Sequence, residues 1–194
     1  MSYVSFVISV IKDFKTKHSM ENVQLEKQAK LSEHYTLGEM TKTSTGMMNI
    51  PSRVSIENMK RVCGWLEALR ARYNLRYVSP SSDHPALTGT PPDSGGEKDT
   101  EEPIIISSGY RSPEVNRKVG GSATSNHLTG CAVDIRVYGI EQAMRYAVIL
   151  MDYADETRQD YDELLIERNR SGRYWVHFAV RPKDNRRKTS FIMA

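Results

Sequence analysis

Apolar residues recur at every third or fourth position after Pro51 and Ser52, and this spacing predicts an amphipathic helix over residues 55–73. The stripe consists of Ile56, Met59, Val62, Cys63, Leu66 and Leu69. A second helix with one apolar side is predicted over residues 140–154. We expect both stripes to pack into the core. Upstream, the spaced apolar residues between Leu31 and Met40 predict a short helix followed by a polar loop.

A different period marks the strands. Residues 104–106 form a short apolar run that ends in Ser107, Ser108 and Gly109, which predicts a buried strand. Residues 131–137 alternate, so Asp134 faces away from the aliphatic side chains of this strand. Residues 163–167 and 174–180 predict a hairpin, in which Trp175 and His177 face away from the aliphatic side.

Between the first two strands, Ser112 and Pro113 suit the cap and first position of a short helix. Gly120 and Gly121 are expected to end it.

The chain has 194 residues, which by a rule of roughly 150 residues per domain favours one domain. We expect an N-terminal arm or helix over residues 1–30 and a basic C-terminal tail over residues 183–194. Residues 79–103 are rich in proline, glycine, serine and acid, so we expect an inserted flexible loop there. Because this loop enters directly before the strand that leads to Arg111, it is predicted to border the cleft and to affect substrate choice.

The charge balance excludes some partners. Lysine and arginine number 27 against 24 acids, a net charge of +3, so no nucleic-acid partner is expected. The longest apolar run near the start, residues 4–11, is far shorter than the ~20 residues of a membrane span, so no stable membrane insertion is expected either. Cys63 and Cys131 are too few for a disulfide framework; we expect buried thiols, and sequence leaves a single bridge between them open.

Candidate metal chemistry is limited to a few residues. Of five histidines, His18, His34 and His84 lie in segments without obvious ligand partners. His127 lies in a glycine- and serine-flanked loop that runs into the strand of Asp134, and His177 lies on a later strand. Two imidazoles and a carboxylate are a frequent ligand set for catalytic zinc. From the residues alone, the alternative is a loop histidine and a strand histidine with ordinary hydrogen bonds.

Three consecutive motifs carry a resemblance. They are Ser108-Gly-Tyr-Arg-Ser-Pro-Glu114, Val119-Gly-Gly-Ser-Ala-Thr-Ser-Asn-His127 and Leu128-Thr-Gly-Cys-Ala-Val-Asp-Ile135. Together they resemble the zinc D-alanyl-D-alanine carboxypeptidase family, including related phage-type peptidoglycan peptidases. The resemblance extends over residues 31–182, through Tyr161-Asp-Glu-Leu-Leu-Ile-Glu167 and Trp175-Val-His177. It implies an α+β fold of the hedgehog/DD-peptidase type, with an antiparallel sheet and flanking helices.

The resemblance also implies the site. His127, Asp134 and His177 would bind Zn²⁺, Arg111 would face the substrate, and Ser125 would lie in the same pocket. Trp175 is an expected aromatic wall, with ordinary packing as the alternative. For Arg111, the alternative is an ion pair with Glu114 or another acid. Cys131 is not expected to bind the metal, because strand alternation turns it away from Asp134.

The general base departs from the better-known family pattern, which has an acid three positions before the last histidine. Here that position is Tyr174, and a tyrosine with a pKa near ~10 is a poor base at neutral pH. We therefore predict Glu167 as the base, with Glu163 as the second candidate and Asp162 as the third.

The expected function is hydrolysis of a peptide bond in peptidoglycan stem peptides by metal-activated water, as a D-Ala-D-Ala carboxypeptidase or as an endopeptidase of the endolysin type. The missing acid at position 174 keeps open a catalytically inactive, zinc-containing cell-wall binding module on the same fold. Without a clear signal peptide, we expect a protein made in the bacterial cytoplasm, from a phage or mobile element, that acts at the cell wall as a monomer.

Overall fold

The computed structural model describes residues 27–78 and 101–193. Most of the predicted arm over residues 1–30 and of the predicted insertion over residues 79–103 lies outside the described residues. Within them the helices are α2 (Leu37–Met40), α3 (Arg53–Tyr73), α4 (Pro113–Lys118) and α5 (Ile140–Thr157). A π-helical turn (Asn74–Val78) extends α3, and a short 3₁₀ helix, η2 (Asn126–Thr129), precedes the second strand.

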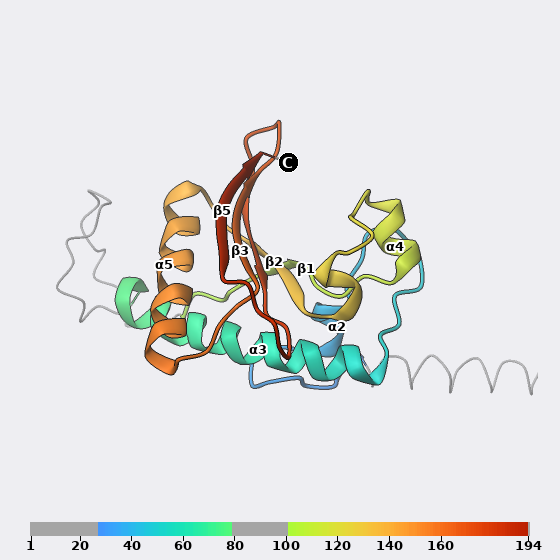
Figure 1. The fold of residues 1–194 in the computed structure, drawn as a ribbon, viewed down its shortest axis with the longest axis horizontal. Helices are drawn as coiled ribbons and strands as arrows, with labels where there is room; N and C mark the ends of the chain where they lie inside the picture. The colour runs from blue at the N-terminus through green and yellow to red at the C-terminus, as the bar shows by residue number, and fades with distance from the viewer. Residues whose placement is uncertain (1–26, 79–100, 194) are drawn as a thin grey trace, which may run out of the picture.

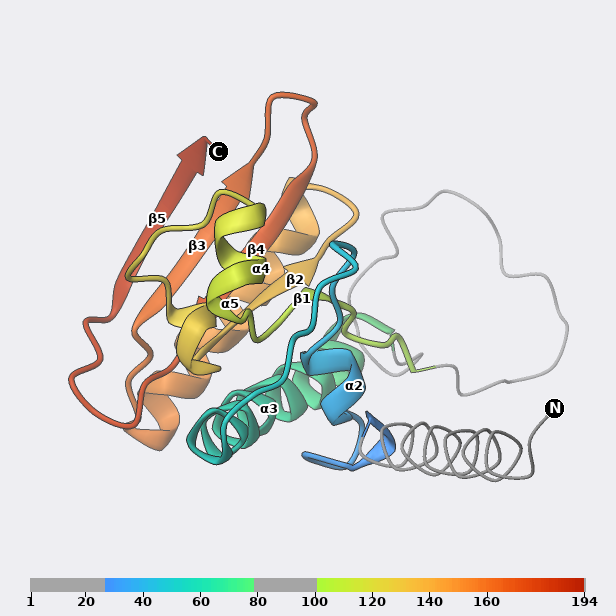
Figure 2. The ribbon, with the colours of Figure 1, turned by 90° about the vertical axis from the view of Figure 1, so that its right-hand side faces the viewer.

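Five strands form one sheet in the order β1-β2-β4-β3-β5. Their bounds are β1 Ile106–Ser108, β2 Ala132–Arg136, β3 Glu163–Arg168, β4 Tyr174–Ala179 and β5 Lys188–Met193. Figure 2 shows the sheet from the side on which α4 lies. The α+β class predicted from the sequence is confirmed.

The sheet is mixed and not wholly antiparallel. The pairs β1–β2, β2–β4 and β3–β4 are antiparallel as predicted, but β3 and β5 run parallel. The predicted basic tail therefore contains an edge strand. Local sequence gave no strong signal for β5, because nearly all of its residues are exposed and lack the apolar alternation of a half-buried strand.

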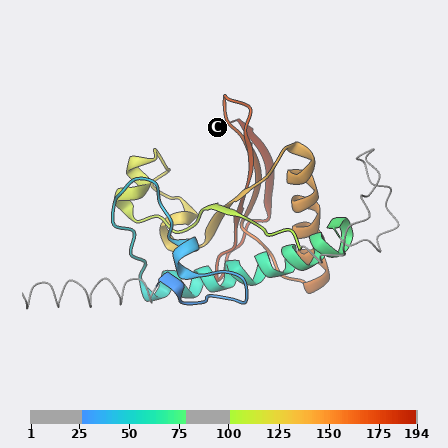
Figure 3. The same cartoon turned by 180° about the vertical axis from the view of Figure 1, so that it is seen from behind.

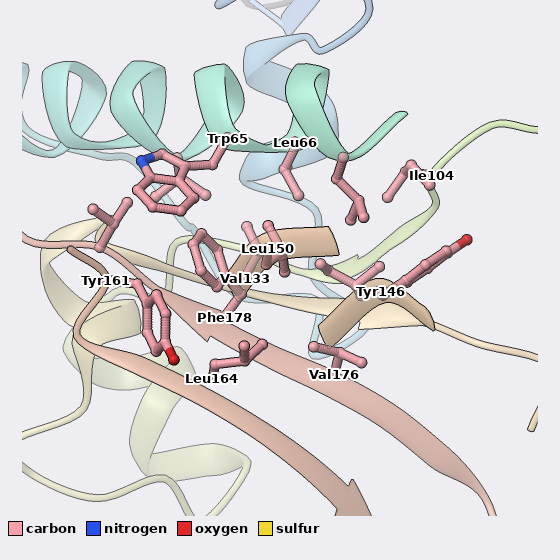
Figure 4. Close-up of a cluster of buried hydrophobic side chains, with 14 of the residues drawn as sticks. Trp65, Leu66, Ile104, Val133, Tyr146, Leu150, Tyr161, Leu164, Val176 and Phe178 are labelled. Atoms are coloured by element: carbon pink, nitrogen blue, oxygen red, sulfur yellow. The ribbon is translucent and has the colours of Figure 1, made fainter. Parts of the chain in front are cut away.

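Helices α3 and α5 cover one face of the sheet, as Figures 1 and 3 show from opposite sides. The core fills the space between these helices and the strands. Figure 4 shows Trp65 and Leu66 from α3 above Val133 and Phe178 from the sheet. The Trp65 ring meets the Tyr153 ring edge-on, with centroids 4.8 Å apart. The predicted stripe of α3 thus faces the core, where Val62, Leu66 and Leu69 are completely buried. The apolar side predicted for the second helix is only partly right: Ala143 and Ala147 are buried, but Ile140, Met144 and Val148 are exposed, and α5 faces the core instead with Tyr146, Ile149 and Leu150.

Local capping determines where the helices begin. The hydroxyl of Ser52 accepts a hydrogen bond from the backbone N–H of Ser55, so α3 begins two residues earlier than the spacing predicted. Ser112 caps α4 with Pro113 at its first position, which confirms that prediction. No helix among residues 27–78 and 101–193 is both long enough and apolar enough to cross a bilayer.

The other face of the sheet is partly covered by the segment between β1 and β2, which contains α4 and η2 (Figure 2). Two glycines let this segment pack closely. A Cβ on Gly109 would lie 2.3 Å from the Met40 carbonyl oxygen. Gly130 ends η2 with a φ of +74°, and a Cβ there would lie 2.5 Å from the Ser55 carbonyl oxygen. The chain therefore turns tightly between η2 and β2.

Candidate metal centre

The predicted metal ligands come together on the face of the sheet opposite α3 and α5. They are His127, Asp134 and His177. One ligand atom from each lies within 4.8 Å of the others, and all three residues are buried. Asp134 on β2 and His177 on β4 are direct cross-strand partners, while His127 comes from η2. Asp134 Oδ1 lies 3.0 Å from His177 Nδ1 and 3.3 Å from His127 Nε2. We call these three residues the imidazole cluster.

The orientation of His127 is fixed by the backbone. Its Nδ1–H donates to the carbonyl oxygen of Gly109 over 2.6 Å, which leaves Nε2 free to bind a metal. Its backbone N–H donates to the Ser125 hydroxyl over 3.3 Å, so Ser125 caps η2 as well as lining the hollow beside the cluster. The hydrogen bond from Nδ1 to the Gly109 carbonyl is of the kind that histidine ligands of metals usually make with their second ring nitrogen.

Opposite charges stabilise the ionised form of Asp134. Burial acts to raise the pKa of this carboxyl, but His127 and His177 hold it well below its ordinary value. Burial likewise acts to lower the pKa of His177, whereas hydrogen bonds to Asp134 and Glu163 raise it to about 9. Binding of a metal therefore has to release a proton from His177.

The residues fit a zinc ion. Two imidazole nitrogens and one carboxylate oxygen, buried together on three separate elements, are a donor set that Zn²⁺ prefers in catalytic sites. Cys63 and Cys131 are both buried free thiols, and Cys131 is not part of the imidazole cluster. His34 lies elsewhere, with its Nδ1 2.7 Å from Glu67.

Arg111 contacts the cluster directly. Its Nη2 donates to Asp134 Oδ2 over 2.6 Å, and its Nε donates to the Ser108 hydroxyl over 2.9 Å. The alternative predicted for Arg111, an ion pair with an acid, is thus present, but with Asp134 and not with Glu114, which pairs with Arg117. Because a guanidinium has five N–H groups, Arg111 holds Asp134 in place and still has donors available for a ligand.

Two carboxylates flank His177 from strand β3. Leu165 lies directly opposite His177 in the sheet, so Glu163 and Glu167, two positions away on either side, share its face. Three basic side chains surround the Glu163 carboxylate. It lies 3.5 Å from His177 Nε2, 3.0 Å from Arg186 Nη2 and 3.5 Å from Lys188 Nζ. Hydrogen bonding to His177 and the nearby positive charges lower the pKa of Glu163 to about 2.

Glu167 has the opposite electrostatic environment. Burial raises the pKa of this carboxyl above its ordinary value, and it has no ion pair among the residues that the structure describes. Glu167 lines a hollow of about 350 Å³ together with Ser125, Glu163 and His177. Tyr174, which replaces the usual acid, packs against the core.

Asp162, the third candidate base, belongs to a separate group of residues. Its carboxylate is completely buried and accepts hydrogen bonds from Arg186 Nε (2.8 Å), Arg186 Nη2 (2.7 Å) and Asn126 Nδ2 (2.7 Å). Arg181 Nε lies 3.0 Å from it. We call Asp162, Arg181 and Arg186 the arginine cluster. With its oxygens occupied in this way, Asp162 has no free position for a proton from substrate or water.

Trp175 lies on the same face as the imidazole cluster. It is the cross-strand partner of both Arg136 and Glu167, and it lines a second hollow next to Asp134. This placement agrees with an aromatic wall of the site.

Sequence reasoning missed several supporting groups. Ser108, the Gly109 carbonyl, Asn126 and Arg186 all contact site residues or their neighbours. The first two lie inside the motif around Arg111, which was the available signal. Arg186 lies in the predicted tail, and no sequence pattern indicated its role, because its partners Asp162 and Glu163 are more than 20 positions away in the sequence.

Residues 97–162 match the family model described as Peptidase M15. No curated protein matches the chain. The matched segment contains Arg111, His127 and Asp134, whereas Glu163, Glu167 and His177 follow it and are joined to it by the sheet. This match supports the resemblance noted in the sequence, and over residues 97–162 the chain is similar to the M15 peptidases.

Proposed function

We propose that this protein is a zinc metallopeptidase that hydrolyses a peptide bond in peptidoglycan stem peptides, either at a terminal D-alanine or within the stem or a cross-link. One observation carries the proposal. His177 of the buried imidazole cluster lines the same hollow as Glu167, a half-buried carboxylate without an ion pair among the described residues. The match to the peptidase family supports the reaction class.

His127, Asp134 and His177 would hold the ion. A bound Zn²⁺ in such a site supplies Lewis acidity and a nucleophile derived from water at neutral pH. The hydrogen bond from His127 Nδ1 to Gly109 and the contact of Arg111 with Asp134 keep two of the ligands in place before the ion arrives.

Glu167 is the proposed general base. Its carboxylate accepts the proton of the attacking water and then delivers it to the leaving nitrogen, so that the hydroxyl goes to the carbonyl carbon and the proton to the new amine. Glu163 suits this task less, because Arg186 and Lys188 pair with its Oε1 and favour its ionised form, and Asn126 donates to its Oε2. The raised pKa of Glu167 makes it the stronger proton acceptor of the two.

Arg111 and Ser125 are proposed to bind substrate. The free N–H groups of Arg111 are available to stabilise negative charge on the attacked carbonyl oxygen or to hold a substrate carboxylate. Ser125 lines one hollow together with His177, and Trp175 lines the other together with Asp134. A peptide that occupies both hollows would therefore contact two members of the imidazole cluster.

The test uses purified protein and a defined muropeptide, with products identified by mass spectrometry. We expect release of D-alanine or of shorter peptides by the zinc-loaded protein, no release after chelation, and recovery when Zn²⁺ is added back. The product masses identify the bond. Unchanged muropeptide in the presence of one bound zinc per chain would overturn the enzymatic proposal and would support the wall-binding module.

A further inference from the structure

A second hollow shares no lining residue with the one that contains Glu167. It has a volume of about 360 Å³, and Asp134 and Trp175 form part of its wall. Three cationic side chains also line it: Lys42 from the loop after α2, Arg136 at the end of β2, and Arg173 just before β4. We call this space the basic hollow.

The three cations of the basic hollow are not neutralised. Among residues 27–78 and 101–193, Lys42, Arg136 and Arg173 have no ion pair and all three are exposed. By contrast, Arg111 and Arg186 nearby are each bound to a buried aspartate. The charges of Lys42, Arg136 and Arg173 are therefore available to a ligand.

The acid in the wall of the basic hollow does not offset these charges. Asp134 is the one carboxylate among its lining residues, and Arg111 already binds its Oδ2. The hollow that contains Glu167 has a different charge: its lining includes Glu163 and Glu167, and its arginines are those of the arginine cluster, bound to Asp162. The two hollows beside the imidazole cluster thus differ in charge.

We propose that the basic hollow is a substrate subsite that binds a carboxylate of the peptide. Arginine and lysine form strong charge-assisted hydrogen bonds with carboxylates. Trp175 and Ile106 provide apolar surface in the same wall, which suits the aliphatic part of an amino acid that carries the carboxylate. The inference rests on the proposed function, since it assigns specificity to the same site.

The experiment compares muropeptides in which one carboxylate at a time is converted to a carboxamide. This change removes the charge and keeps the shape. Amidation of the carboxylate that binds in the basic hollow is expected to lower kcat/KM of the zinc-loaded wild type by about tenfold relative to the unmodified peptide. The preference is expected to shrink at high ionic strength, because exposed charges are screened.

The variant K42Q/R136Q/R173Q is expected to lose that preference, so that the ratio of free acid to amide falls close to one. The matched control is R53Q/K118Q/K183Q, which removes the same charge from exposed positions outside both hollows. It should retain the wild-type ratio.

The outcomes separate the two proposals. Cleavage of every peptide with an unchanged ratio in the hollow variant would overturn the subsite and leave the peptidase intact. Absence of cleavage by the zinc-loaded wild type would overturn the proposed function. In that case calorimetric binding of the same peptides decides the subsite: equal affinity of wild type and hollow variant for the free acid would overturn it as well, and a tenfold weaker affinity of the variant would support it.

Discussion

Asp134 and Asp162 are both buried carboxylates, yet their partners are of different kinds. Asp162 is surrounded by Arg186, Arg181 and Asn126, whose donors occupy its oxygens permanently. Asp134 shares Oδ1 between two imidazoles and gives Oδ2 to Arg111. Imidazoles exchange a proton for a metal near neutral pH, and guanidinium groups do not.

Burial of a carboxylate therefore does not by itself indicate chemistry. In both cases burial acts to raise the pKa of the aspartate and nearby donors lower it. The arginine cluster is a fixed ion pair that ties the segment before β5 to the sheet, whereas the imidazole cluster can take a cation. Variants at the two aspartates and their neighbours test this difference.

The largest effect is expected at the metal ligand itself. Asp134→Asn should lose bound zinc, and peptide hydrolysis should fall by at least on the order of 10³-fold, as for other essential catalytic groups. Asp162→Asn, the matched change in the arginine cluster, should retain one zinc per chain. Elemental analysis and rates of product formation measure both. Full zinc content and activity in Asp134→Asn would remove the distinction between the two aspartates.

Glu163 and Glu167 extend the comparison, because Glu163 contacts the arginine cluster and Glu167 does not. Glu167→Gln should lower kcat by roughly 10²–10⁴-fold, the usual contribution of a general base, with zinc retained. Glu163→Gln should lower it less, since its carboxylate already serves Arg186 and Lys188. A larger loss in Glu163→Gln than in Glu167→Gln would reverse our assignment of the base.

Asp162 should matter for stability. Removal of its charge in Asp162→Asn leaves two arginines without their buried partner, and we expect a loss of about 2–4 kcal/mol in the free energy of unfolding, less than for a fully buried pair because both arginines are partly exposed. Denaturant unfolding at pH 7 measures it. An unchanged denaturation midpoint would mean that the arginine cluster does not contribute to the free energy of unfolding.

The same contribution depends on pH. Burial acts to raise the pKa of Asp162, but Arg186, Asn126 and Arg181 lower it below its ordinary value. The stabilisation is thus fully present above the unfolded pKa of about 3.9 and is lost as pH falls further. The difference in unfolding free energy between wild type and Asp162→Asn should accordingly shrink below about pH 4. A difference that stays constant at lower pH would contradict this sign.

The smallest effect is expected at the hydrogen bond that orients His127. A methyl group on Gly109 would lie 2.3 Å from the Met40 carbonyl oxygen, so Gly109→Ala must displace the loop whose carbonyl accepts from His127 Nδ1. We expect zinc affinity to weaken by about 10–100-fold, measured by competition with a chelator. Gly64→Ala, at an exposed helical position with no close neighbour, is the control and should leave the affinity unchanged.

Much of the local structure could be predicted because it depends on neighbours in the sequence. The predicted cap at Ser112 is a local hydrogen bond, and the alternation of β2 and β4 correctly placed Asp134 and His177 away from the aliphatic face. By contrast, β5 was predicted only as a basic tail. Its parallel pairing with β3 joins residues some 25 positions apart and is not encoded in its own pattern.

The motifs around Arg111, His127 and Asp134 by themselves carried the resemblance to the peptidase family and two of the three candidate ligands, because these residues are close in the chain and their types are chemically restrictive. Only the tertiary structure decided that His177 lies opposite Asp134, that Arg186 occupies Asp162, and that Lys42, Arg136 and Arg173 line one hollow. Each of these contacts joins distant segments. Strand register, loop path and packing of the sheet bring them together, and no pattern of neighbouring residues specifies these.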